Sequence, residues 1–469
     1  MFCNNLFQDI KILFRDNWLT ALVISLSLLF AFATYNGHNH TQKRLNDISE
    51  VEREWERKDS VMFANLIKIE KGEKVDEPYW LLPSEPMNIG YRYPRLAIME
   101  PEEFSFISIG QSDMYTHFKS PTVYGNNFAL DYSEMVNPVQ LLFGNFDLAF
   151  VFIYILPLLI IAFTYNILSK EKELGTFRLL SSQPISIISW LFQKILIRFI
   201  IFNFITILSL IIVIFSFYFN QIGLKGTLQV IGLIIAYNSF WFVLSYYINI
   251  TINNSSINIF SLVGIWLLLV LIVPAGINQI SNSLYSTPSR LKMVNDIRSI
   301  KKENEKKQNE IMDEYLRDHP EFAEESGQEK FGFWHRYFAS EKMMEQKIKP
   351  LIAEFDIQLK KQQELIRVFE FISPVTIMQQ SMNRIAGTSE LHYNDFKKQV
   401  FEFSNKWRNY LVPMLFKKEK FTTKNYETLP IFSYQNNIKS KASKSILIIL
   451  LINAIIVFVF EFFYRKRKE

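Results

Sequence analysis

Residues 169–185 read SKEKELGTFRLLSSQPI and lie between two long apolar runs. A short polar connection of this kind is typical of a loop at a membrane surface. We interpret its centre as an amphipathic helix, because Leu174 and Phe177 are three residues apart and charged residues crowd the first turn. Gly175 costs such a helix about 1 kcal/mol relative to alanine, which is reasonable where another backbone approaches closely. Pro184 ends this helix and can open the next one.

The composition indicates a membrane protein with large water-exposed parts. The chain has 469 residues, of which 49% are hydrophobic and 21% charged. The net charge of +5 and the absence of a basic patch interleaved with aromatics do not favour nucleic acid as a partner. Cys3 is the only cysteine, so an intrachain disulfide is excluded. The sequence has no GxxxxGK[ST] loop, so we do not expect this chain itself to bind ATP.

Six apolar runs are long enough to cross a bilayer. We assign the spans to residues 18–35, 146–168, 190–219, 228–248, 257–277 and 446–463. Residues 1–17 have one apolar face and are predicted to form an amphipathic helix at the membrane interface, in contact with lipid. Pro157 predicts a kink in the second span, and Pro274 with Gly276 predicts a break near the end of the fifth. A basic tail, residues 464–469, closes the chain.

Two long polar insertions separate these spans, at residues 36–145 and 278–445. The first predicts a charged helix over Thr41–Phe63, followed by turns and short strands between prolines. The second predicts a helical hairpin formed by Leu291–Arg317 and Ser340–Ile372. Neither has an obvious core of its own, so we expect the two to fold together as one mixed α/β domain. The fold class is therefore an α-helical integral membrane protein with six spans and this domain.

The positive residues predict the orientation. Lys and Arg occur near the N-terminus, in residues 169–189 and at the C-terminal end, which places these segments and both termini in the cytoplasm. Both insertions then lie outside.

Polar side chains within the spans have two readings. Asn203, Thr206, Asn238 and Ser245 either line a path or join helices by hydrogen bonds, and the second is the more common explanation.

Catalytic and metal-binding motifs are missing from the sequence. His38 and His40 form an H-x-H pair, but nothing nearby completes a metal site, and an exposed loop is the better reading. G-x-S-x-G and H-E-x-x-H are both absent, so a membrane-bound enzyme is disfavoured.

The polar connection also resembles a known motif. It is similar to the E-x-E-x-G-T-x-x-L-L-x-x-x-P segment of type-2 ABC transporter permeases, through Glu171, Glu173, Gly175, Thr176, Leu179, Leu180 and Pro184. In that family the segment is a coupling helix that docks on the ATPase subunit. The resemblance implies ATPase contacts from Glu171, Glu173, Gly175, Thr176, Phe177, Arg178 and Leu180. The competing interpretation is an ordinary interfacial helix.

A second segment resembles one subgroup of these permeases. Residues 371–388 read FISPVTIMQQSMNRIAGT, and the similarity is carried by Ser373, Pro374, Ser381, Ala386, Gly387 and Thr388. The subgroup has large extracytoplasmic insertions after the first span and before the last. Its members share an architecture and no common cargo, so the resemblance does not imply a substrate.

Together the resemblances imply a permease subunit of an ATP-driven exporter in the bacterial inner membrane. It would pair with a second permease, identical or not, while ATP and Mg²⁺ are bound by a separate ATPase subunit. The alternative is a non-transporting scaffold that transmits motion to a periplasmic or lipid-anchored protein. The two differ in whether a polar path runs along the dimer axis, which the sequence does not show.

Overall fold

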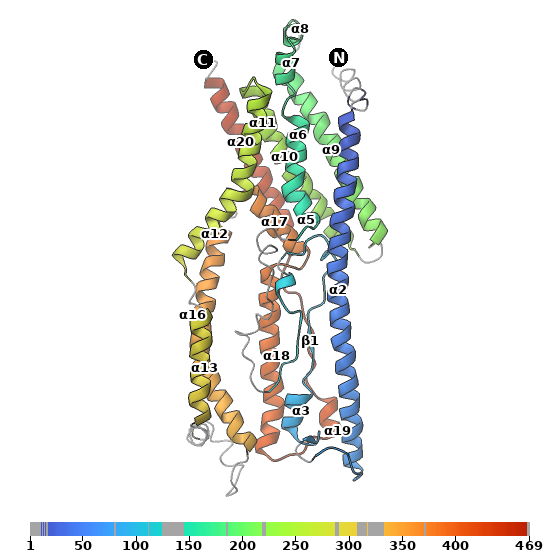
Figure 1. The fold of residues 1–469 in the computed structure, drawn as a ribbon, viewed down its shortest axis with the longest axis vertical. Coiled ribbons are helices and arrows are strands. Elements are labelled where there is room, and N and C mark those ends of the chain that lie inside the picture. The colour runs from blue at the N-terminus through green and yellow to red at the C-terminus, as the bar shows by residue number, and fades with distance from the viewer. Residues whose placement is uncertain are drawn as a thin grey trace.

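The computed structural model is an elongated, mainly helical molecule (Figure 1). It describes residues 11–466 apart from residues 12, 14, 16, 79–80, 111, 124–144, 184–185, 218–221, 287–289, 307–316, 318–332 and 370–371. The predicted interfacial helix of residues 1–17 therefore lies mostly outside the described residues, as does half of the tail of residues 464–469.

Within the described residues, six helical segments are long and apolar enough to cross a bilayer. The chain is thus a multi-pass α-helical membrane protein, with the predicted number of spans. The segments are α2 (Asn17–Glu70), Leu148–Glu173, α9 (Ile187–Phe217), α10 (Leu224–Thr251), Ser255–Leu284 and α20 (Ala442–Lys466). The second contains α5 (Leu148–Phe150), α6 (Leu156–Thr164) and α7 (Ser169–Glu173), and the fifth contains α11 (Ser255–Leu267) and α12 (Val273–Leu284).

Helix α10 lies at the centre of the bundle, where its Tyr237 and Trp241 are fully buried. Polar residues join it to its neighbours, because lipid offers them no other partners. Asn238 Nδ2 donates to Asn203 Oδ1 of α9 at 3.0 Å. The prediction of interhelical bonding is confirmed there and at Ser245, which is described below. Thr206 differs, since its hydroxyl donates to a carbonyl of its own helix.

Helix α2 is a single helix of 54 residues, about 80 Å long at 1.5 Å per residue. A bilayer core is about 30 Å thick, so α2 extends far beyond it. The sequence analysis placed a span at residues 18–35 and a separate helix from Thr41, but residues 36–40 are helical as well. Neighbouring segments hold this polar stretch in place: Asn36 Nδ2 donates to the Phe146 carbonyl at 2.9 Å, and the Thr41 hydroxyl lies 3.2 Å from that of Ser105.

Gly37 lies where α2 meets the backbone of Phe106. A Cβ atom built on Gly37 would be 2.0 Å from the Phe106 carbonyl oxygen, well inside van der Waals contact. The absence of a side chain at Gly37 therefore allows the backbone around Phe106 to pack closely against α2.

We expect Gly37→Ala to destabilise the protein by about 1–3 kcal/mol, because the added methyl overpacks a rigid backbone contact. Gly264→Ala is the matched control, since nothing lies within 4 Å of a Cβ there. Thermal unfolding in detergent, followed by tryptophan fluorescence, measures both variants. Equal melting temperatures for Gly37→Ala and the unmodified protein would contradict the close contact.

Two prolines within the membrane-crossing segments each follow a π-helical turn. Pro157 follows the turn Val151–Ile155, and Pro274 follows the turn Leu268–Ile272. A proline ring collides with the carbonyl four residues earlier in a regular α-helix, and the wider π turn relieves that collision. The predicted break at Pro274 and Gly276 is wrong: the chain stays helical to Leu284, with a bend between α11 and α12 (Figure 1).

The described parts of residues 36–123 and 286–441, which we call the distal region, extend from the bundle to the end of the molecule opposite α7, and α17 lies where the region meets the bundle (Figure 1). Its further elements are α3 (Pro86–Arg92), β1 (Ala97–Ile98), β2 (Phe118–Lys119), α13 (Arg290–Lys306), α16 (Phe333–Phe369), α17 (Pro374–Ile385), α18 (Glu390–Phe416) and α19 (Thr423–Glu427). The described strands pair in one two-stranded antiparallel sheet. The described part of this region is mainly helical, whereas the sequence analysis predicted a mixed α/β domain.

The two polar insertions share a hydrophobic core in the distal region. Met62 of α2 and Ile89 of α3 pack with Trp407 and Leu411 of α18. Burying these side chains, each worth about 1.5–3 kcal/mol, requires both insertions at once. The expectation that the two insertions fold together agrees with this packing, although the second insertion also has a small hydrophobic cluster of its own. The described part of the predicted hairpin is also present, since α13 and α16 pack together through Ile297 and Ile348 among others.

Candidate coupling site

The segment singled out from the sequence folds as two short helices, α7 and α8 (Phe177–Ser181). In Figure 1 they lie at the end of the molecule where α2 begins and α20 ends, opposite the distal region. The prediction of one continuous helix is wrong. Gly175 separates the two helices with a φ of +77°, a left-handed conformation that side-chain-bearing residues rarely adopt.

Gly175 is therefore explained by its backbone conformation. The sequence analysis attributed it to the close approach of another backbone, but nothing in the described structure lies within 4 Å of a Cβ placed there. The turn also holds itself together locally. The Thr176 hydroxyl lies 3.1 Å from the carbonyl oxygen of Glu171 and also bonds the Glu171 carboxylate. Lys172 lies over the Phe177 ring, 5.2 Å from its centre.

Glu173 attaches the turn to the N-terminus of α11. Its carboxylate accepts from the Ser255 backbone N–H at 2.7 Å and from the Ser255 hydroxyl at 2.9 Å. Unpaired N–H groups and the helix dipole make this end of a helix favourable for a negative charge. Asn254 caps the same end by accepting from the N–H groups of Ser256 and Ile257. Glu173 makes this intramolecular contact and is also exposed, and its contact with an ATPase stays a prediction.

Below the turn, buried polar groups join α6 and α7 to α11. The Ser169 hydroxyl lies 2.7 Å from that of Ser255. Asn258 Nδ2 donates to the Tyr165 carbonyl at 3.0 Å and to the Ser169 hydroxyl at 3.3 Å. Ser169 and Asn258 are fully buried. Together with Glu173, these bonds connect the turn to the helices of the bundle.

Further groups join α6 to α10. Ser245 Oγ donates to Thr164 Oγ1 at 2.6 Å, and Asn249 Nδ2 donates to the Thr164 carbonyl at 2.9 Å. Asn249 Oδ1 also accepts from the Leu168 N–H at 3.4 Å. We call the set Thr164, Ser169, Glu173, Ser245, Asn249, Ser255 and Asn258 the polar ladder. It links the α7–α8 turn to both α10 and α11.

The exposed surface of the turn includes two apolar residues that were not among the predicted contacts. Leu174 and Leu179 are 66% and 70% exposed, although neither was among the predicted contacts. Phe177 and Leu180 are only partly exposed, and Phe177 packs against the bundle. Arg178 and Thr176 are exposed, Glu171 is partly buried, and Pro184 lies outside the described residues. The turn thus presents two leucines beside polar groups at the end of the molecule.

The second predicted segment forms the junction between the bundle and the distal region. Ser373 caps α17, and its hydroxyl donates to the Leu269 carbonyl in the π turn at 2.9 Å. Ile377, Met378 and Met382 are buried in the bundle core. At the other end of α17, Thr388 Oγ1 donates to the Ser108 carbonyl at 2.9 Å.

Asp147 occupies the same junction, immediately before α5. Its carboxylate accepts from the N–H groups of Phe150 at 2.7 Å and Ile109 at 2.8 Å. Burial raises the pKa of Asp147 to about 6. His40 of the H-x-H pair contacts Asp113 at 3.2 Å, so its partner is a carboxylate of the distal region.

Comparison with known proteins adds one match. Residues 290–435 match a family model described as a domain of unknown function, DUF3526. The match runs from α13 to the extended segment after α19, so this part of the distal region is similar to that family. No match was found among curated proteins or among solved structures.

Proposed function

We propose that this chain is the permease subunit of an ATP-binding-cassette exporter, and that the α7–α8 turn docks on a separate ATPase subunit. The observation that carries the proposal is the arrangement of the turn. Leu174 and Leu179 face outward, while Glu173 binds the turn to α11. The class of partner, an ATPase subunit, is inferred from the resemblance of the motif to that of type-2 permeases. ATP and Mg²⁺ would be bound by that partner, and a second permease would complete the conduit.

The polar ladder is strong enough to transmit such a movement. Shifting a two-state transporter from 1:99 to 99:1 takes about 5.5 kcal/mol of differential binding. Nine side-chain hydrogen bonds of the described residues join the segment Thr164–Glu173 to α10, α11 and the loop between them. Six of these bonds are buried or partly buried, and at about 0.6 kcal/mol each inside a membrane they amount to about 4 kcal/mol. A movement of α7 is therefore transmitted to α10 and α11, because breaking these bonds costs a free energy comparable to that of the two-state transition.

The proposed orientation places the α7–α8 turn and both termini in the cytoplasm of a bacterium, and the distal region outside the inner membrane. Lys170, Lys172 and Arg178 in this short connection support it, because cytoplasmic loops carry an excess of positive residues. The connection of residues 220–227 at the other end has only Lys225.

Cysteine labelling tests this orientation. With Cys3→Ser, we add either Ser182→Cys in the turn or Ser60→Cys in the distal part of α2, both exposed positions. A membrane-impermeant maleimide is expected to label Ser60→Cys in intact spheroplasts, and Ser182→Cys only after permeabilisation. The reverse pattern would overturn the proposed topology.

A second candidate function is mechanical transmission without transport. The continuity of α2 favours it, because a helix of 54 residues joins the bundle to the distal region without a break. In this reading the ATPase drives the distal region against a periplasmic or lipid-anchored protein. ATP-dependent release of that protein, with no substrate accumulating in inverted vesicles, separates it from export.

A further inference from the structure

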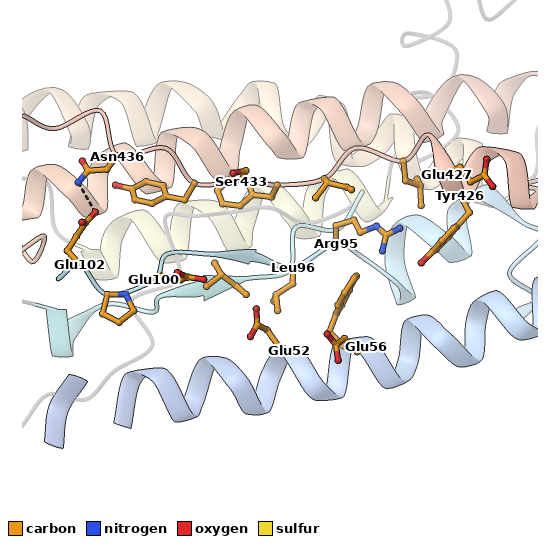
Figure 2. A pocket seen from close by; sticks show the side chains of 17 residues that line it. Glu52, Glu56, Arg95, Leu96, Glu100, Glu102, Tyr426, Glu427, Ser433 and Asn436 are labelled. Atoms are coloured by element: carbon orange, nitrogen blue, oxygen red, sulfur yellow. Dashed lines mark hydrogen bonds between the residues drawn. The ribbon is translucent and has the colours of Figure 1, made fainter. Parts of the chain in front are cut away.

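A groove of about 820 Å³ opens in the distal region. Its walls are α2, the segment of residues 95–102 that contains β1, and residues 426–436, which comprise the end of α19 and the extended segment after it (Figure 2). Its volume lies within the range of ligand-binding clefts, about 300–1,000 Å³. It is separate from the polar ladder and from α17.

The groove contains a free strand edge. The Met99 N–H donates to the His117 carbonyl of the strand that pairs with β1. Backbone groups of alternate residues in a strand point to opposite edges, so those of Leu96, Ile98 and Glu100 face away from β2. All three residues line the groove, and no described hydrogen bond uses their backbone groups. An edge of this kind is a template for pairing with a further strand.

The groove is acidic. Figure 2 shows Glu52 and Glu56 on α2, Glu100 and Glu102 on the β1 segment and Glu427 on the third wall. These carboxylates surround apolar side chains, among them Ile431, which is 82% exposed. A partner with positive charges at alternating positions complements both features.

Among the described residues that line the groove, Arg95 is the one cation, and its charge is already compensated. Its Nη1 pairs with Asp59 at 3.2 Å, and its guanidinium lies between the rings of Trp55 and Tyr426. Arg95 is only 8% exposed, yet its Nε–H has no hydrogen-bond acceptor in the described structure. A buried donor without an acceptor costs about 1–3 kcal/mol. We expect a peptide carbonyl in the groove to supply one.

We propose that this groove binds an extended, lysine- or arginine-rich segment of a peptide or protein, which pairs with the free edge of β1. Backbone hydrogen bonds to Leu96, Ile98 and Glu100 provide affinity, and the glutamates select cationic side chains. The site is independent of ATPase docking, so failure of either proposal leaves the other intact.

The test uses the full-length protein in detergent and fluorescently labelled ten-residue peptides of alternating lysine and valine. Fluorescence anisotropy is expected to show saturable binding. A peptide of alternating glutamate and valine is expected not to bind. An N-methylated lysine–valine peptide, which keeps its charge but lacks strand-pairing N–H groups, is expected to bind about tenfold more weakly.

Glu52→Gln with Glu100→Gln is expected to weaken binding about tenfold. Glu54→Gln with Glu402→Gln removes the same charge at positions outside the groove, and is expected to leave affinity unchanged. Equal weakening in the two double variants would overturn the site. Equal binding of the N-methylated peptide would overturn strand pairing, and binding of the glutamate peptide would overturn the charge selection.

Discussion

Exchanging Leu174 and Leu179 together for glutamate is expected to abolish docking of the ATPase subunit, and transport with it. The two side chains are 66% and 70% exposed at the tip of the molecule. Burying a leucine at an interface is worth about 1.5–3 kcal/mol, so losing both weakens binding by about 10²-fold to 10⁴-fold. Each glutamate adds a desolvation cost. Co-purification of the ATPase subunit and its permease-stimulated hydrolysis are the measurements.

The matched control is the double variant Val61→Glu and Ile431→Glu. It makes the same chemical change at two exposed apolar positions of the distal region. We expect the ATPase to co-purify with this control in unchanged amount. A Leu174→Glu and Leu179→Glu protein that reaches the membrane and retains its ATPase would contradict docking through the turn.

Asn249→Leu is expected to uncouple transport from ATP hydrolysis without releasing the ATPase subunit. Asn249 is fully buried, and its side chain donates at 2.9 Å to the carbonyls of both Thr164 and Ser245. Leucine fills the space but bonds neither α6 nor the Leu168 N–H. Losing about 1–2 kcal/mol of this link lowers transport per ATP hydrolysed by about tenfold. Parallel assays of transport and hydrolysis in proteoliposomes give that ratio.

Asn238→Leu is the control for Asn249→Leu. Asn238 is equally buried on the same helix, but it bonds Asn203 of α9, and no hydrogen bond among the described residues joins it to the polar ladder. We expect it to affect stability while leaving the transport-to-hydrolysis ratio near that of the unmodified protein. An equal fall of the ratio in both variants would show that any buried asparagine of α10 matters, and not the ladder.

The spans were predictable because a long apolar run has few alternatives to a membrane helix. The continuity of α2 was not, because residues 36–40 look like a polar loop and are kept helical by Phe146 and Ser105, which are far away in sequence. The prediction at Pro274 was wrong for a local reason. A proline predicts a break, but the π turn before it preserves the helix.

At the turn, the motif indicated a candidate site but not its geometry. A glycine inside a helix and a glycine between two helices look the same in sequence, so Gly175 was misread. Splitting the helix there changes which side chains face outward, which brings Leu174 and Leu179 to the surface. Glu173 finds its partner at Ser255, 82 residues later. The uncharged run Asn253–Ser256 was the available signal, since Asn and Ser favour helix caps.

Photo-crosslinking from position 179 in living cells tests the central claim most directly. A photoreactive residue replaces Leu179 in one protein and Ile431 in another, and the adducts are identified by mass spectrometry. The account predicts that Leu179, and not Ile431, captures a cytoplasmic protein containing the GxxxxGK[ST] loop of an ATP-binding-cassette ATPase. An adduct of Leu179 with an extracytoplasmic protein, or the absence of any ATPase adduct, would contradict it.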